Sequence, residues 1–184
     1  PGIAALTTNE IVALTTAQVA GLTTAQVAAL TTNSIAALQT TDLQAIQTTD
    51  LRVLSTTQLG ALTTNQLPTL TTAQVAALTT SQIGALSTAQ VLALETRDLV
   101  ALGTAAVRAL ETADIAALTS TQVAAMSTAQ LASLGSEQLA ALSSAAVKGL
   151  SSSALPALGD SIGDLGSAPL AALSRVQIRA LTTA

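Results

Sequence analysis

The sequence of 184 residues contains no histidine, no cysteine and no aromatic residue. Without His and Cys, the chain lacks the commonest general base, the commonest metal ligand and every thiol nucleophile or disulfide. Gly-rich phosphate loops and nucleophile motifs are also missing. We therefore expect that the protein is not an enzyme, and the sequence predicts no catalytic residue, no cofactor site and no metal site.

Charge is also scarce, because only 9% of the residues are charged and the formal net charge is -4. This balance makes nucleic acid an unexpected partner. Half of the residues are apolar, but polar residues interrupt every group of eight, so the run of about 20 apolar residues that a membrane-spanning helix needs is missing. The chain begins at Pro1 without an initiator Met, and we expect it to be a fragment of a longer protein.

What the sequence does contain is a repeat of eight residues. The stretch 70–86, LTTAQVAALTTSQIGAL, states the unit twice, and a large aliphatic residue stands on every eighth position from Leu6 to Leu158. The spacing then falls once to seven, at Leu165, and returns to eight at Leu173. A short fixed period is typical of a solenoid, in which each unit contacts only its neighbours.

The polar positions of each octad, counted from its Leu, indicate a short helix. The second residue is Thr or Ser almost throughout, as at Thr16 and Thr72, and we interpret it as the helix N-cap. The fourth residue is usually Gln, Asp or Glu, which suits the positive end of a helix. The first residue is sometimes Gly, which predicts a left-handed residue just past a helix end. These glycines are Gly103, Gly135, Gly159 and Gly166.

Two rival structures fit the octads less well. In one continuous helix the Leu would drift by roughly 80° per octad, so no single buried stripe would form. A β-solenoid would place many Ala and Gln residues in strands, which they disfavour. We therefore predict an all-α solenoid of very short helices, one per octad, with about four octads per turn. It should form a single domain over residues 1–184 that is irregular at 159–169.

The variation between octads predicts which positions are buried. The Leu and the fifth residue stay large and aliphatic, so they should form the core. The seventh residue is nearly always Ala or Gly, which predicts close approach between helices. The third and sixth positions vary and should face water. They carry five of the six basic residues, Arg52, Arg97, Arg108, Lys148 and Arg179.

The acidic residues offer candidate sites that we do not favour. Asp42 with Asp50, Glu95 with Asp98, and Glu111 with Asp114 could be paired carboxylates or cation ligands. Neighbouring octads place Gln at the fourth position, so we interpret these acids as charges at helix N-termini. Asp160 and Asp164, with Gly159 and Gly163, faintly resemble a calcium loop, but their spacing does not match an EF-hand.

Regular Thr arrays can also present an ordered face to ice or to a mineral. The second Thr of each octad should be occupied as a cap, and the first position varies among Thr, Ser, Gln, Glu and Gly. A surface matched to a lattice would not tolerate that mixture, so this function is an alternative that we rank last.

The octapeptide carries one resemblance. The segment 15–20, TTAQVA, and its copies resemble the C-terminal octapeptide-repeat domain of the MtxA protein of magnetotactic bacteria. This resemblance implies a bacterial, magnetotaxis-associated accessory protein and implies no role for any particular residue. From the repeat itself we expect a structural scaffold that binds other proteins, with the irregular segment 159–179 as its docking site. The alternative is a passive spacer or surface stalk.

The predicted core can be tested by substitution. Leu78→Ala should cost about 2–5 kcal/mol of unfolding free energy, because it removes a buried side chain. Arg108→Ala at a water-facing position should be nearly neutral. Urea denaturation followed by circular dichroism measures both, and equal costs would contradict the assignment of faces.

Overall fold

The computed structural model describes residues 2–181; Pro1 and residues 182–184 lie outside the described residues. All regular structure in residues 2–181 is helical, with nineteen α-helices, four 3-10 helices and no strand. The α-helices are four to seven residues long, and almost every octad contributes one short helix. The prediction of an all-α solenoid is therefore confirmed.

The chain divides into two compact units, one ending at Ala93 and the other beginning at Leu94. The prediction of a single domain over 1–184 stays a prediction. The helices of the first unit are η1 (Ile3–Ala5), α1 (Thr8–Val12), α2 (Thr16–Ala20), α3 (Thr24–Ala28), α4 (Thr32–Ala37), α5 (Thr40–Ala45), α6 (Thr48–Leu51), α7 (Thr56–Gly60), η2 (Leu67–Thr69), α8 (Thr72–Ala77), α9 (Thr80–Ile83) and α10 (Thr88–Ala93).

The second unit has the same construction. Its helices are α11 (Thr96–Ala101), α12 (Thr104–Ala109), α13 (Thr112–Ala117), α14 (Ser120–Ala125), α15 (Thr128–Ala132), α16 (Ser136–Ala141), η3 (Ala146–Gly149), α17 (Ala154–Ala157), η4 (Gly159–Asp164), α18 (Ser167–Ala171) and α19 (Arg175–Leu181).

The N-cap lies one residue earlier than predicted. Each typical helix begins at the second residue after the Leu, and the first residue is the cap: the Thr15 side chain accepts a hydrogen bond from the N–H of Gln18. The Leu and the cap are both extended, as at Leu78 (φ -60°, ψ 141°) and Thr79 (φ -74°, ψ 159°). The prediction was wrong because Thr occupies both positions and either could supply a capping oxygen.

The prediction of left-handed glycines is wrong at three of the four positions. Gly103 (φ -67°), Gly135 (φ -76°) and Gly166 (φ -59°) are extended N-cap residues, because two extended residues already complete the link between helices. Only Gly159 is left-handed, with φ 52°. There α17 is followed at once by η4, and the positive φ turns the chain without the usual extended link.

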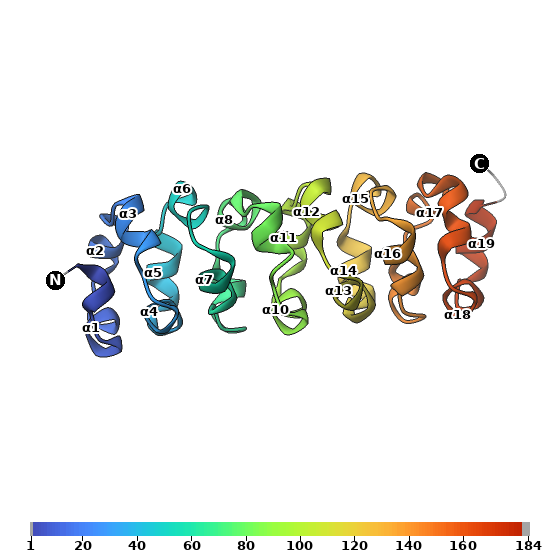
Figure 1. Ribbon diagram of the computed structural model, residues 1–184. Helices are drawn as coiled ribbons and strands as arrows, with labels where there is room; N and C mark the ends of the chain where they lie inside the picture. The colour runs from blue at the N-terminus through green and yellow to red at the C-terminus, as the bar shows by residue number, and fades with distance from the viewer. Residues whose placement is uncertain (1, 182–184) are drawn as a thin grey trace. The chain divides into compact units, whose positions relative to one another are not determined.

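Within each unit the helices coil so that each packs on the helix three octads further along. In the first unit α1 packs on α4 and α2 on α5, and Figure 1 shows these pairs side by side. In the second unit α11 packs on α14 and α13 on α16. One turn therefore takes between three and four octads, slightly fewer than the predicted four.

Burial follows the predicted faces. The Leu series is buried from Leu30 to Leu173, and the fifth positions from Ile11 to Leu155 are buried as well. The third positions are exposed throughout, and the sixth positions are exposed with few exceptions. Leu6, Leu14 and Leu22 are only half-buried, because they belong to the first turn, whose outer face no described turn covers.

The irregular segment does not end the array. The lost residue falls in η4, which still packs on α16, and α19 still packs on α17. The coil therefore keeps its three-octad spacing through 159–169, as the sequence predicted when it indicated a kink and not an end.

Gly149 marks a close approach between two turns, in line with the small residues predicted at the seventh position. A Cβ at Gly149 would lie 1.9 Å from the carbonyl oxygen of Ser120 in α14, which is backbone and cannot rotate away. Gly149→Ala should therefore force η3 away from α14 and cost about 1–3 kcal/mol or more of unfolding free energy. Gly163→Ala is the control, because a Cβ there meets no atom within 4 Å. Urea titrations of both variants that coincide with the wild type would refute the close contact.

Candidate functional site

The fourth position of the octad is the main buried polar position of the structure. From the second turn onward its side chains are mostly inaccessible to water, as for Gln74 (2% exposed) and Gln130 (2% exposed). Burying an amide is costly unless its donors and acceptor are all hydrogen-bonded. A place at the positive end of a helix, which the sequence predicted for this residue, does not by itself explain why it is buried.

Each such Gln joins two turns of the coil. The Oε1 of Gln74 accepts a hydrogen bond of 2.8 Å from the N–H of the cap residue Thr71, and the N–H of Gln74 donates to the Thr71 hydroxyl at 3.2 Å. This reciprocal pair is a capping box. The Nε2 of Gln74 then donates to the carbonyl oxygens of Ile46 (2.7 Å) and Leu43 (2.8 Å), at the C-terminal end of α5 in the preceding turn.

The same bond recurs along both units, always to a carbonyl 28 residues earlier, with distances between 2.6 and 3.2 Å. We call this series the glutamine ladder. Its donors and acceptors are Gln58 to Leu30, Gln66 to Leu38, Gln74 to Ile46, Gln82 to Leu54, Gln90 to Leu62, Gln122 to Leu94, Gln130 to Leu102 and Gln138 to Leu110.

The ladder stops after Gln138, because the next four fourth positions are Ala146, Ala154, Ile162 and Pro169, and it resumes beyond the irregular segment. Gln177 donates to the carbonyls of Leu150 and Val147, both at 2.8 Å, which lie 27 and 30 residues earlier. Regular octads use offsets of 28 and 31, as Gln130 does with Leu102 and Leu99. The difference is the single residue lost after Leu158, so Gln177 binds the same two positions of the preceding turn as a regular ladder Gln.

The first turn shows the capping box without the ladder. Gln18 and Gln26 are exposed and keep their bonds to Thr15 and Thr23. The only Glu at a fourth position is Glu10, which also lies in this turn. Hydrogen bonds from the Thr7 N–H and hydroxyl lower the pKa of Glu10. A carboxylate can serve the capping box but has no N–H to donate to a preceding turn.

Four octads replace the ladder Gln with Asp, and these octads also change their first residue. All four carry Gln or Glu in place of the capping Thr, Ser or Gly, and no other octad does. The pairs are Gln39 with Asp42, Gln47 with Asp50, Glu95 with Asp98, and Glu111 with Asp114. The long and short side chains have exchanged places, so that Asp114 Oδ2 accepts the N–H of Glu111 at 3.0 Å.

The exchanged octads use different contacts between turns. The Thr16 hydroxyl donates to Asp42 at 2.7 Å, and the Thr24 hydroxyl donates to Asp50 at 2.6 Å. The Gln at the first position can donate to the preceding turn in place of the fourth-position Gln, since Gln39 Nε2 donates to the carbonyl of Val12 at 2.8 Å. Asp42 and Asp50 lie in the first turns of α5 and α6, as the sequence predicted. They are, however, buried between turns and not exposed.

Asp98 differs from these carboxylates. Its side chain is fully buried, and neither of its oxygens has a well-formed hydrogen bond. Arg97 lies 3.7 Å from Asp98 Oδ1 and also pairs with Glu95 at 3.0 Å. Burial raises the pKa of Asp98, although the charge of Arg97 and the nearby Glu95 N–H lower it in part. The Arg97 side chain is 58% exposed, so water weakens its attraction.

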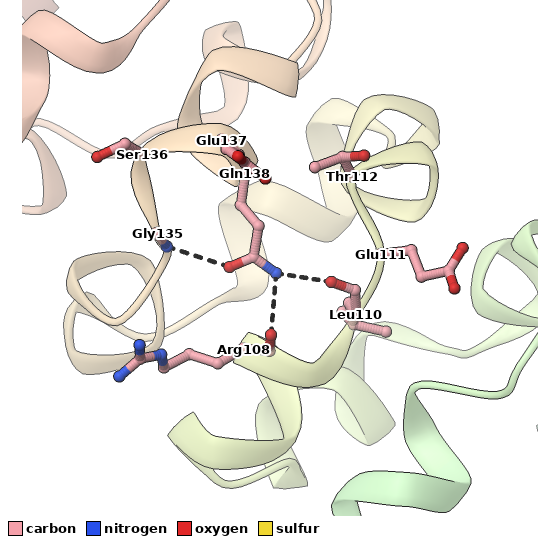
Figure 2. Close-up of a pocket in the computed structure, with 8 residues that line it drawn as sticks. All are labelled: Arg108, Leu110, Glu111, Thr112, Gly135, Ser136, Glu137 and Gln138. Atoms are coloured by element: carbon pink, nitrogen blue, oxygen red, sulfur yellow. Dashed lines mark hydrogen bonds between the residues drawn. The ribbon is translucent and has the colours of Figure 1, made fainter.

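A surface hollow of about 570 Å³ opens beside Gly135, between α12 and α16. A Cβ at Gly135 would meet no atom within 4 Å, so the missing cap side chain accounts for part of the space. Figure 2 shows the side chains of Arg108 and Glu111 extending away from each other. Gln138 points inward, but its amide already bonds to the Gly135 N–H (3.1 Å) and the Leu110 carbonyl (2.7 Å).

The other candidate acids do not converge. Asp42 and Asp50 lie on different helices, each with its own Thr partner, and Asp160 and Asp164 lie in η4, where Asp160 is exposed. Among the described residues, no group of three or more Asp and Glu side chains could hold a metal ion. What the fourth-position side chains do chemically is connect helix ends, which is a structural task.

Both units are thus coils of one-octad helices held by an internal ladder, which defines a helical repeat protein. The sequence model of the ALTTAQ repeat family matches residues 3–32, 35–72, 67–95, 91–128, 107–144 and 123–152, and the chain belongs to this family. None of the curated proteins matches the chain. Within residues 2–181, no helix is both long enough and apolar enough to cross a membrane.

The ladder can be tested by removing its donor. Gln74→Glu keeps the capping oxygen but places a buried carboxylate against the carbonyls of Leu43 and Ile46. We expect a loss of about 3 kcal/mol or more of unfolding free energy at pH 7, because both groups are acceptors. Gln18→Glu is the matched control and should be nearly neutral, since Gln18 is exposed and Glu10 already fills the equivalent position. Similar losses in the two variants would mean that the amide donors contribute nothing.

Proposed function

We propose that the chain is a non-enzymatic structural scaffold that binds other proteins. The polar groups of its interior are used by the ladder, so contacts with a partner fall to the exposed third and sixth positions and to the irregular C-terminal segment. Solenoids commonly bind through such extended surfaces. This function needs no cofactor.

The observation that carries this proposal is the exposed apolar surface of α19. Val176 is 68% exposed and Ile178 is 48% exposed; both lie in the last described turn, where no following turn covers the fifth position. With Arg175 and Arg179 they line a hollow of about 380 Å³. An exposed apolar patch with polar residues at its rim can mark a protein interaction site, and Arg is enriched at such sites, so we propose that the docking surface lies within the segment 159–179.

The resemblance of residues 15–20 to the MtxA repeat domain supports a more specific biological role. We extend the proposal to a bacterial accessory protein associated with magnetotaxis, in which the partner belongs to that machinery. The family match by itself supports only a structural repeat domain.

A Thr face for ice or mineral is the second candidate, and one finding bears on it. The cap is the first Thr, so the second Thr is not used for capping, and it is exposed in most octads. However, Thr16 and Thr24 donate their hydroxyls to Asp42 and Asp50, and these bonds interrupt the row. We therefore keep the protein scaffold as the preferred function.

The proposal predicts that partner binding depends on α19. The intact chain, a Val176→Ser/Ile178→Ser variant and a Val100→Ser control should be used to capture proteins from a lysate of the source organism. Val100 is also exposed (50%) but lies on α11. Captured proteins should then be purified, and their affinity should fall at least about tenfold for the double variant only. Should the intact chain capture nothing specific, the spacer function replaces the scaffold.

A further inference from the structure

The glutamine ladder has a gap inside the second unit. In regular octads a fourth-position Gln donates to carbonyl oxygens of the preceding turn, as Gln130 does with Leu99 and Leu102. Four successive fourth positions after Gln138 carry side chains that have no hydrogen-bonding group. They are Ala146, Ala154, Ile162 and Pro169. These octads can therefore form no ladder bond to the turn that precedes them.

The octads of the gap also have fewer hydrogen bonds within themselves. The hydroxyls of Ser143 and Ser151 accept the N–H groups of Ala146 and Ala154, both at 3.1 Å. An Ala side chain cannot accept the cap N–H in return, so half of the capping box is lost. In addition, η3 and η4 are 3-10 helices, in which the hydrogen-bond geometry is poorer than in an α-helix.

The gap leaves a junction that is held by packing. We call the junction between residues 94–142 and residues 143–181 the seam. Across it η3 packs on α14, α17 on α15 and η4 on α16, and Gly149 lies close to the Ser120 carbonyl. Buried aliphatic side chains such as Val147 and Leu155 contribute there as they do at every junction of the unit. What distinguishes the seam is the missing ladder bonds, so we expect it to be the weakest junction within the second unit.

Ladder bonds hold the octads together on each side of the seam. Beyond it Gln177 of α19 donates to the carbonyls of Val147 and Leu150, both at 2.8 Å, which lie in and just after η3. In addition, α17 packs on α19 and on η4. Before the seam, Gln130 and Gln138 join α15 and α16 to the octads one turn earlier. Each side is therefore connected by bonds that the seam itself lacks.

We propose that residues 143–181 form a module that opens at the seam as one cooperative body, while residues 94–142 stay folded. Opening at the seam separates apolar contacts and breaks no ladder bond, whereas opening one turn earlier would break the bonds of Gln130 and Gln138. The exposed surface of α19 belongs to the module and moves with it. The opening needs no partner, so it is tested independently of the proposed function.

Backbone amide hydrogen exchange in the intact chain, followed by mass spectrometry at urea concentrations below global unfolding, tests the module. Amides of η3, α17 and α19 should share one opening equilibrium and one urea dependence. Their protection should be at least about tenfold lower than that of α15 and α16, because each missing bond shifts an opening equilibrium about fivefold. Fraying inward from α19 predicts instead a stepwise decrease in protection from η3 to α19. That stepwise pattern, or equal protection in α17 and α15, would overturn the proposal.

Two matched variants test the cause. Gln177→Ala removes the bonds that join α19 to η3, so exchange in α19 should become at least about tenfold faster while η3 and α17 keep their wild-type rates. Gln130→Ala removes the equivalent two bonds before the seam and should lower the protection of α15 by a similar factor. Unchanged exchange in α19 or in α15 would contradict the role given to the ladder. The wild-type exchange pattern decides the proposal even if a variant fails to fold.

Discussion

The structure depends on hydrogen bonds at the helix ends, because each helix is so short that most of its backbone N–H and C=O groups lie at an end. An α-helix leaves its first four N–H groups and its last four carbonyls without partners, and a helix of five or six residues has little else. Such a helix is unstable alone. In each unit the Gln of the fourth position forms hydrogen bonds with both kinds of helix end. Its oxygen accepts the cap N–H of its own helix, and its nitrogen donates to the last carbonyls of a helix in the preceding turn.

This double use explains several features of the composition. The amide must be both acceptor and donor, so Gln fits the fourth position and Glu occurs there only at Glu10, in the first turn. The carbonyl oxygens that accept hydrogen bonds from the Gln Nε2 lie 28 residues earlier. The number of octads per turn must therefore bring these carbonyls within reach of the Gln side chain. Aliphatic residues fill the interior, and Gly149 allows a backbone approach that a Cβ would prevent.

The sequence predicted the features of the fold that depend on residues within one octad, and it did not predict those that depend on contacts between turns. The eight-residue period and the conservation of size at the Leu and fifth positions predicted the solenoid and its core, because burial limits size at each octad in the same way. The position of the cap could not be decided, since Thr15 and Thr16 are chemically alike. The ladder joins residues 28 apart, so no pattern within one octad indicates it. One signal was available in the sequence: wherever Asp stands at the fourth position, the first residue is Gln or Glu, as for Gln39 with Asp42 and Glu95 with Asp98.

Because the ladder lies inside the coil, the residues that stabilise the fold are different from the residues that form its surface. The third and sixth positions take no part in it, so they can vary without loosening the coil, as the range from Ala to Arg and Glu at these positions illustrates. Features that distinguish one octad from the next therefore arise where the ladder or cap itself is altered. At Gly135 the cap side chain is missing and a hollow opens; at Asp98 the donor is missing and a buried carboxyl takes its place. In a chain of nearly identical units, the altered octads are where specific behaviour can arise, because the regular ones offer the same surface many times over.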